Sequence, residues 1–406
     1  MDSALGTAAR ALCLGDPLTA LKLVALREDP AALALRGIAM AQLGELAKAR
    51  KLLKRAGRLF GDDEPVAHAR AVVAEAEVAL AMRDLGAASR ELDAARELLS
   101  RRGDLVNACF AQLIAVRRLA LLGETAAAER SLREASFERA PPRLVALCGL
   151  VEAELAMKRL DGRGAEAALA RARVAAVRAN IAALLAEVEH AEQRLAAPVA
   201  RLRRGGEIAL VRLSELEPIF GADELVVDAC RRQLRFGARV ISLITRPLLL
   251  ELLVTLAEAA PEGATREQLI SRAFGARRVN ESHRARLRVE IGRLRKLLAS
   301  LVRIDATAAG FALTPLGAAG VVSLLPPADG EASALLSLLS GGDAWSTSGL
   351  AAAIGKSQRA VQRALGELAD EGKVRASGQG PARRWTAAPA TGIATTLLLV
   401  APGTLG

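Results

Sequence analysis

The stretch LRVEIGRLRKLL, residues 287–298, decides how the second half of this 406-residue chain folds. Four of its apolar side chains recur at steps of four, three and four residues, which places them on one face of a helix. These are Leu287, Ile291, Leu294 and Leu298. Basic side chains occupy other positions of the segment 280–301, and a buried apolar seam would turn them toward solvent. The basic residues are Arg284, Arg286, Arg288, Arg293, Arg295 and Lys296.

Short apolar segments before this helix predict three strands. They span 225–228, 233–236 and 240–243, and turn-forming residues separate them. A helix is expected next, over 247–259, because proline is tolerated in the first turn of a helix. The pattern therefore changes from short strands to helices within this region.

Two further signals frame the basic helix. Thr265 is followed three residues later by Gln268, a capping-box pattern that predicts the start of the helix REQLISRAF. After the basic helix, the segments 302–305 and 310–313 predict the two strands of a β-hairpin.

This order of elements resembles the DNA-binding domain of OmpR/PhoB-type response regulators over almost the whole domain, 222–316. The piece IGRLRKLL is the most specific part of the match. The resemblance implies a winged-helix fold whose basic helix enters the major groove of double-stranded DNA. It also implies two groups of contacts: bases for Arg286, Arg288 and Arg293, and the phosphate backbone for Arg284 and Lys296.

Two positions depart from this family. Glu290 stands where relatives often have histidine, and a carboxylate on the basic face would repel phosphate. The hairpin segment 307–309, Thr-Ala-Ala, lacks the arginine that relatives place in the minor groove. This domain is therefore expected to bind DNA weakly by itself or to dock a protein.

Residues 331–388 predict a second, smaller unit of the same type. Helices are expected at 331–340, 348–354 and 358–371, with Gly355 in the tight turn between the last two. The segment LAAAIGKSQRAVQRALGELADEGKVRASGQGPARRW resembles the winged helix-turn-helix shared by many bacterial repressors and DNA-uptake proteins. Its last part is expected to form the hairpin, or wing.

The third helix of this second unit has an inward face of Val361, Leu365 and Leu368. The start of that helix therefore presents polar side chains, and glutamine and arginine suit the edges of adenine and guanine. Serine can cap the helix and touch phosphate. The expected DNA contacts are Ser357, Gln358, Arg359, Gln362 and Arg363 from the helix, and Arg383 and Arg384 from the wing.

The first 197 residues carry an internal repeat. Apolar helical stretches end at Leu43, Leu85, Leu122 and Leu160, at steps of 42, 37 and 38 residues, and an Ala/Leu-rich helix follows each. This resembles tetratricopeptide-type (TPR) repeats, with Ala or Leu at most of the usual aromatic positions. It predicts a stacked α-solenoid that receives a ligand, peptide or protein, or that serves as a spacer or dimerisation arm.

The charge is distributed unevenly along the chain. Residues 1–200 hold 29 basic and 26 acidic side chains, whereas residues 201–406 hold 27 and 19, and the net charge is +11. A near-neutral half joined to a basic half is typical of a partner-binding part attached to a polyanion-binding part. A solvated basic surface is the alternative interpretation.

The sequence predicts no enzyme. The three histidines are isolated from other metal ligands, and no nucleophile–base pattern is present. We therefore expect no catalytic residue, no cofactor and no metal. Because no signal peptide and no apolar run of about 20 residues is found, we expect a cytoplasmic protein that makes no membrane contact and joins the nucleoid when bound to DNA.

The predicted fold class is mainly α, with an N-terminal TPR-like α-solenoid followed by two α+β winged-helix domains. The expected domains are 1–197 (repeats), 198–221 (linker), 222–316 (first winged helix), 317–330 (linker), 331–388 (second winged helix) and 389–406 (tail). The predicted function is a sequence-specific double-stranded DNA-binding transcriptional regulator, whose repeat half senses a ligand or docks a partner or protomer. The sequence allows a homodimer. The alternative is a non-enzymatic scaffold that uses its winged helices for protein contacts or non-specific DNA binding.

Overall fold

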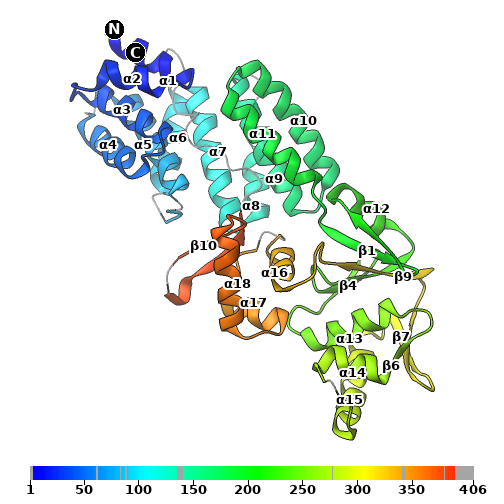
Figure 1. Cartoon of the computed structure of the whole chain (residues 1–406). Coiled ribbons are helices and arrows are strands. Elements are labelled where there is room, and N and C mark those ends of the chain that lie inside the picture. Colours follow the sequence, from blue (N-terminus) through cyan, green and yellow to red (C-terminus); the bar gives the residue numbers. More distant parts are fainter. Residues whose placement is uncertain are drawn as a thin grey trace. The chain divides into compact units, whose positions relative to one another are not determined.

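The computed structural model describes residues 3–60, 63–82, 84–86, 89–134, 140–276, 278–340, 343–378 and 380–388. The chain is mainly helical and carries β-sheets in its second half (Figure 1). It divides into two compact units. We call residues 3–156 and 163–194 the helical unit, and residues 157–162 and 195–388 the sheet unit. Within the described residues, every helix is too short or too polar to cross a bilayer.

The helical unit contains helices α1 to α11. Their bounds are α1 Ser3–Cys13, α2 Pro17–Val24, α3 Pro30–Gln42, α4 Leu46–Leu59, α5 Pro65–Ala81, α6 Ser89–Arg101, α7 Leu105–Leu121, α8 Thr125–Arg133, α9 Pro142–Lys158, α10 Gly162–Ala179 and α11 Ala182–Ala196. From α1 to α8 each helix contacts the next one in the sequence. The alternate helices α1, α3, α5 and α7 also contact one another, so these helices stack in chain order.

Burial differs between the two sets of helices. Helix α3 lies between its neighbours and buries Leu33, Leu35 and Ile38 together with several small residues. Helix α4 buries only one face, through Ala49, Leu53 and Ala56, and its other positions carry lysine and arginine. The alternating apolar and amphipathic helices of the sequence therefore correspond to inner and outer positions in the stack.

Turns in the helical unit mostly follow the predicted markers. Gly44 and Gly123 have φ of 82° and 83°, a left-handed conformation that glycine adopts at low cost after a helix end. Leu160, the fourth marker, has φ of 66°. The second marker, Leu85, was wrong as a helix end, because α5 ends at Ala81 and Leu85 lies in the following turn.

The sheet unit is organised around a six-stranded sheet with the strand order β2-β1-β9-β3-β4-β5. Its strands are β1 Ala200–Arg204, β2 Glu207–Val211, β3 Glu224–Asp228, β4 Gln233–Phe236, β5 Arg239–Ser242 and β9 Gly320–Leu325. A 3-10 turn, η1 Leu213–Glu215, and the helix α12 Leu216–Gly221 connect β2 to β3. β9 pairs in parallel with β3 and antiparallel with β1.

The two expected linkers are therefore wrong as connectors. Segment 198–221 supplies two strands and a helix, and segment 317–330 supplies β9, the strand between β1 and β3. The register pairs Leu202 with Leu324 and Val226 with Val322. Val322 and Leu324 are 1% and 0% exposed, so burial of apolar side chains holds this strand in the sheet.

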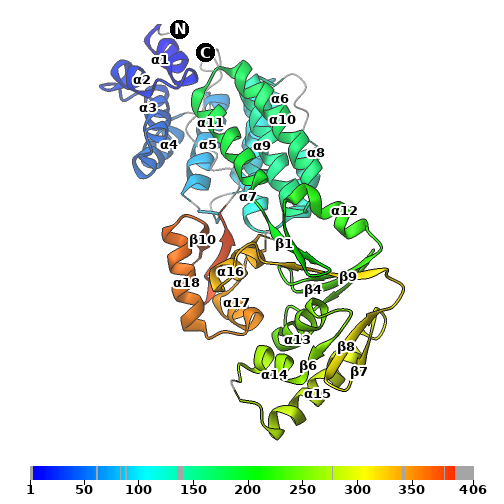
Figure 2. The ribbon, with the colours of Figure 1, turned by 45° about the vertical axis from the view of Figure 1, so that its right-hand side comes forward.

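Three helices and a hairpin complete the part that we call the first module, residues 222–316. The helices are α13 Pro247–Glu258, α14 Arg266–Phe274 and α15 Glu281–Leu298, and a three-stranded sheet contains β6 Ala264–Thr265, β8 Gly310–Pro315 and β7 Val302–Ala306. Figure 2 shows the three helices gathered beside the β7–β8 hairpin. The capping box at Thr265 and Gln268 is confirmed, with both reciprocal hydrogen bonds present.

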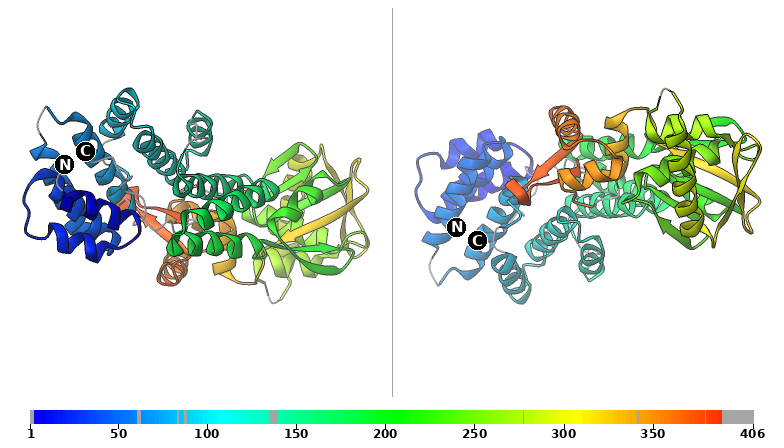
Figure 3. Two further views of the ribbon diagram at one scale, coloured as in Figure 1. Left: turned by 90° about the horizontal axis from the view of Figure 1, so that it is seen from above. Right: turned by 90° about the horizontal axis from the view of Figure 1, so that it is seen from below.

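The second module, residues 331–388, has its own apolar core. It contains α16 Glu331–Leu339, α17 Thr347–Ile354, α18 Gln358–Asp370, β10 Val374–Ser377, the 3-10 turn η2 Gly380–Ala382 and β11 Arg384–Ala387. The β10–β11 ribbon projects from these helices (Figure 3). Gly355 ends α17 with φ of 67°, as the predicted tight turn requires.

Candidate nucleic-acid interface

Helix α15 presents a basic face because its apolar seam is buried. Leu287, Ile291, Leu294 and Leu298 are each at most 1% exposed and belong to the core of the first module. Asn280 caps the helix, since its side-chain oxygen accepts a hydrogen bond from the amide of His283. The seam that the sequence predicted is therefore confirmed, and it fixes the direction of the remaining side chains.

All five predicted contact residues of this helix are exposed, but three of them have acidic neighbours. Arg284 lies 3.9 Å from Glu267 and 3.7 Å from Glu281, and Arg288 lies 3.1 Å from Glu281. Arg293 donates a hydrogen bond of 2.9 Å to Glu290. The guanidinium side chains of Arg284, Arg288 and Arg293 remain 51%, 69% and 66% exposed. The pairs of Arg284 and Arg288 with Glu281 are solvent-exposed, whereas the carboxylate that pairs with Arg293 is only 10% exposed.

Arg286 and Lys296 differ from the other three. Within the described residues, neither has a carboxylate partner. The guanidinium of Arg286 lies 4.6 Å from the ring centroid of Phe274, a cation–π contact that orders the side chain and leaves its hydrogen-bond donors available. Arg286 is thus a cation of this face that an aromatic ring holds and that keeps its donors for a ligand.

Arg295 is also exposed, but its guanidinium is engaged within the fold. Its Nε donates a hydrogen bond of 2.7 Å to the carbonyl of Ile304, and its guanidinium lies 5.7 Å from the ring of Phe311. Both partners belong to the β7–β8 hairpin, so Arg295 fastens the hairpin to α15. Helical periodicity alone could not predict that this arginine differs in its partners from the other arginines of α15.

Glu290 requires a correction. The sequence placed it on the DNA-facing surface, but the residue is only 7% exposed. It is buried with its neighbour Ile291 on the inward side of α15, and its carboxylate forms an ion pair with the guanidinium of Arg293. Glu290 therefore acts on the surface indirectly, by holding Arg293 in place.

The tip of the β7–β8 hairpin carries no outward cation in residues 307–309, as the sequence indicated. Arg266 lies closest, but its Nη1 donates to the carbonyl of Ala308 and its Nη2 to that of Thr307. The arginine therefore closes the tip of the hairpin and does not extend beyond it.

Helix α18 of the second module has a clearer division between its faces. Val361, Leu365 and Leu368 are buried as predicted, together with Ala364. Ser357 is the N-cap, and its hydroxyl oxygen accepts a hydrogen bond of 3.2 Å from the amide of Ala360. The Ser357 O–H remains able to donate to an anion at this helix end.

The other four predicted contacts of α18 all lie on its exposed surface: Gln358, Arg359, Gln362 and Arg363. Arg359 and Arg363 are four residues apart and so share one side of the helix. Within the described residues, neither arginine has a carboxylate partner, in contrast to Arg284, Arg288 and Arg293. α18 therefore offers its cations without internal competition.

The β10–β11 ribbon places further cations near the same module. The guanidinium of Arg383 lies 4.6 Å from the ring of Trp385, and Arg384 donates to the carbonyl of Arg383. Sequence reasoning missed Arg375, which is exposed on β10 opposite Thr386. The alternation of strand residues, with Val374 buried, is the signal that could have found it.

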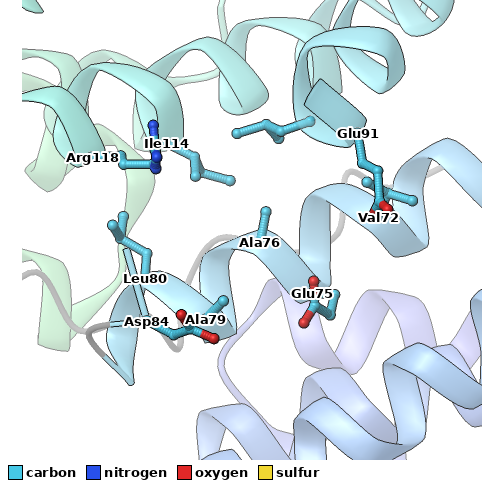
Figure 4. A pocket seen from close by; sticks show the side chains of 10 residues that line it. Val72, Glu75, Ala76, Ala79, Leu80, Asp84, Glu91, Ile114 and Arg118 are labelled. Carbon is cyan, nitrogen blue, oxygen red and sulfur yellow. The ribbon is translucent and has the colours of Figure 1, made fainter. Parts of the chain in front are cut away.

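The helical unit contains a hollow bounded by α5, α6 and α7 (Figure 4). Three carboxylates, those of Glu75, Asp84 and Glu91, and one guanidinium, that of Arg118, line it. Arg50 bonds both Glu75 and Asp84, at 2.7 Å and 2.8 Å. Arg117, also on α7, does not line this hollow but pairs with the buried Glu77.

No protein-family model, curated protein or solved structure matches this chain.

Proposed function

We propose that this chain binds double-stranded DNA through α15 and α18 and acts as a sequence-specific transcriptional regulator. In this proposal both modules are winged helices, and α15 and α18 are their recognition helices. The helical unit is a TPR-like solenoid that receives the ligand, protein partner or second protomer that controls DNA binding.

One observation carries the proposal: two separate helices each bury an apolar seam and expose a basic face. A helix fits the major groove, which is about 12 Å wide, and arginine can donate two hydrogen bonds to guanine. Glutamine can pair with adenine in the same way. α18 offers both side-chain types at neighbouring positions, Arg359 and Gln358, then Arg363 and Gln362.

The ion pairs on α15 weaken this argument only slightly. Exposed ion pairs contribute about 0–1 kcal/mol, whereas phosphate contacts gain from charge-assisted hydrogen bonds and from the release of counterions. Arg284 and Arg288 can therefore exchange Glu281 for a phosphate. Glu290 is buried and competes more strongly for Arg293. We accordingly expect α18 to contribute more affinity than α15.

A second candidate function is a scaffold that uses these modules for protein contacts or for DNA binding without sequence preference. The closed hairpin tip of the first module and the acidic partners of α15 favour it. This candidate predicts either no DNA binding or binding that competitor DNA abolishes.

In vitro selection from a random duplex pool, followed by anisotropy titration at rising salt, tests the proposal. The full chain should enrich a sequence and bind it beside competitor DNA. Arg359→Ala and Arg363→Ala should each weaken binding by about 10-fold, the range for losing a bidentate base contact. Arg239→Ala is a charge-matched control, because Arg239 is exposed on β5 of the same unit.

The outcome separates the two candidates. Enrichment of one sequence, with loss confined to the α18 variants, supports the regulator. Equal affinity for all duplexes supports the scaffold with non-specific binding, and absence of binding at low salt contradicts DNA binding altogether.

A further inference from the structure

The two modules of the sheet unit are connected by more than the chain that joins them. The connector after β9, residues 326–330, is held against β1. Arg201 Nε donates a hydrogen bond of 2.9 Å to the carbonyl of Pro326, and the same guanidinium pairs with Asp329. The amide of Ala328 also donates to the hydroxyl of Ser333 at the start of α16. The connector is therefore bound at both of its ends.

An apolar side chain from the first module packs against the core of the second. Ile244 follows β5 of the first module, yet it packs against the apolar core of the second module. By contrast Ile241, three residues earlier, packs against the core of its own module. Removal of Ile244 from water thus stabilises the docking of the second module on the first.

Helix ends form another contact. Pro247 begins α13, and a Cβ placed on Gly355 at the end of α17 would lie 3.4 Å from the Cβ of Pro247. Helices α13 and α17 also contact each other along the chain trace. The end of α17 therefore lies within van der Waals reach of the start of α13.

Another contact between the modules involves Cys230. Cys230, in the turn after β3, is 2% exposed, and its thiol lies close to the side chain of Ser337 on α16. Burial raises the pKa of Cys230 to about 12. The first module therefore meets the second through three separate residues, Cys230, Ile244 and Pro247.

We propose that the two modules form one rigid reader, so that the chain recognises a DNA site of two elements at a single fixed spacing and helical phase. This inference rests on the proposed function. A flexible tether would let each module bind its own element over a range of spacings. A docked pair cannot, because these contacts fix α18 relative to α15.

The spacing of the selected DNA site tests the inference. Duplexes carrying both elements are bound to the full chain after insertion of about 5 or about 10 base pairs, roughly half a turn or one turn, between them. Both insertions should lower the affinity at least 10-fold, to that of a duplex with one element. In the Ile244→Ser variant, the insertions should lower the affinity by less than 3-fold. In the control Ile241→Ser, they should still lower it at least 10-fold.

A measurement without DNA checks the same junction. Cys230 should react slowly with iodoacetamide in the native chain, because it is buried and its thiolate is scarce. Ile244→Ser should speed the alkylation of Cys230 at least 10-fold, as measured by mass spectrometry, while Ile241→Ser should change it less.

The possible results are distinguishable. If no sequence is enriched, the proposed function fails. If the chain enriches a single element, or binds the two-element duplex equally well at every spacing, the function stands and the rigid reader is refuted. Rapid alkylation of Cys230 in the unmodified chain would also contradict a closed junction.

Discussion

The Nη1 of Arg293 lies 2.9 Å from Oε1 of Glu290, one helical turn earlier on α15. The carboxylate is nearly buried, whereas the guanidinium is 66% exposed, so a hidden acid holds a surface cation. This ion pair distinguishes α15 from α18, because the arginines of α18 have no carboxylate partner within the described residues.

Glu290→Gln is expected to increase DNA affinity. Glutamine keeps a carbonyl oxygen for Arg293 but removes the negative charge, so the guanidinium can turn to phosphate. We expect the affinity for DNA to rise about 3- to 10-fold. The slope of log affinity against log salt concentration should become steeper by about the amount that one phosphate contact contributes. Anisotropy titrations at several salt concentrations measure both quantities. Glu207→Gln on β2 is the matched control, and an equal effect in the control would contradict a role for this pair.

Arg295→Ala is expected to lower stability more than DNA affinity. The substitution removes the hydrogen bond to Ile304 and the contact with Phe311. The free energy of unfolding should fall by about 2 kcal/mol, the lower end for one hydrogen bond to a charged donor plus one cation–π contact, because Arg295 is exposed. Urea titration followed by circular dichroism measures it. Lys296→Ala should show the opposite pattern, with stability unchanged and affinity reduced.

Gly310→Ala is expected to disrupt the hairpin of the first module. A Cβ at this position would lie 1.9 Å from the carbonyl oxygen of Ala264, so β6 would have to move away from β8. We expect a loss of at least about 2 kcal/mol in the free energy of unfolding. Gly320→Ala is the control, because a Cβ there meets nothing within 4 Å. Equal stability of the two variants would contradict this packing.

Arg117→Met is expected to destabilise the helical unit. Its Nη1 lies 2.9 Å from Glu77, which is fully buried, and the substitution leaves that carboxylate without its cation. The loss should be about 3–5 kcal/mol, as for other buried pairs from which one partner is removed. The double variant Glu77→Leu with Arg117→Met should recover most of it in thermal unfolding. Without such recovery, the effect would have to come from lost packing of Arg117.

Local sequence signals predicted much of the fold. Thr265 and Gln268 marked a helix start because the capping box lies within four residues, and the seam of α15 followed from helical period alone. β9 could not be predicted in this way. It pairs with β1 across the chain, and Arg201 bonds Pro326 from 125 residues away. Apolar residues in short segments do not reveal such a distant partner.

The candidate site shows the same division between local and distant information. The exposed positions of α15 and α18 were predictable, since they are what a buried seam leaves outside. The partners of the arginines were not. Arg295 turns toward Ile304, and Glu290 is buried, because the hairpin and the neighbouring helices pack beside them. Charge counts treat these side chains alike, although their surroundings give them different roles.

The position of β9 between β1 and β3 has a consequence for synthesis of the chain. Until the ribosome has added residues 320–325, β1 and β3 lack the strand that joins them. Each of these two strands therefore keeps an edge with unpaired backbone groups. The six strands can be completed only after residue 325 has emerged. A gene fragment ending at 316 would therefore encode a product prone to self-association, however complete its three helices and hairpin.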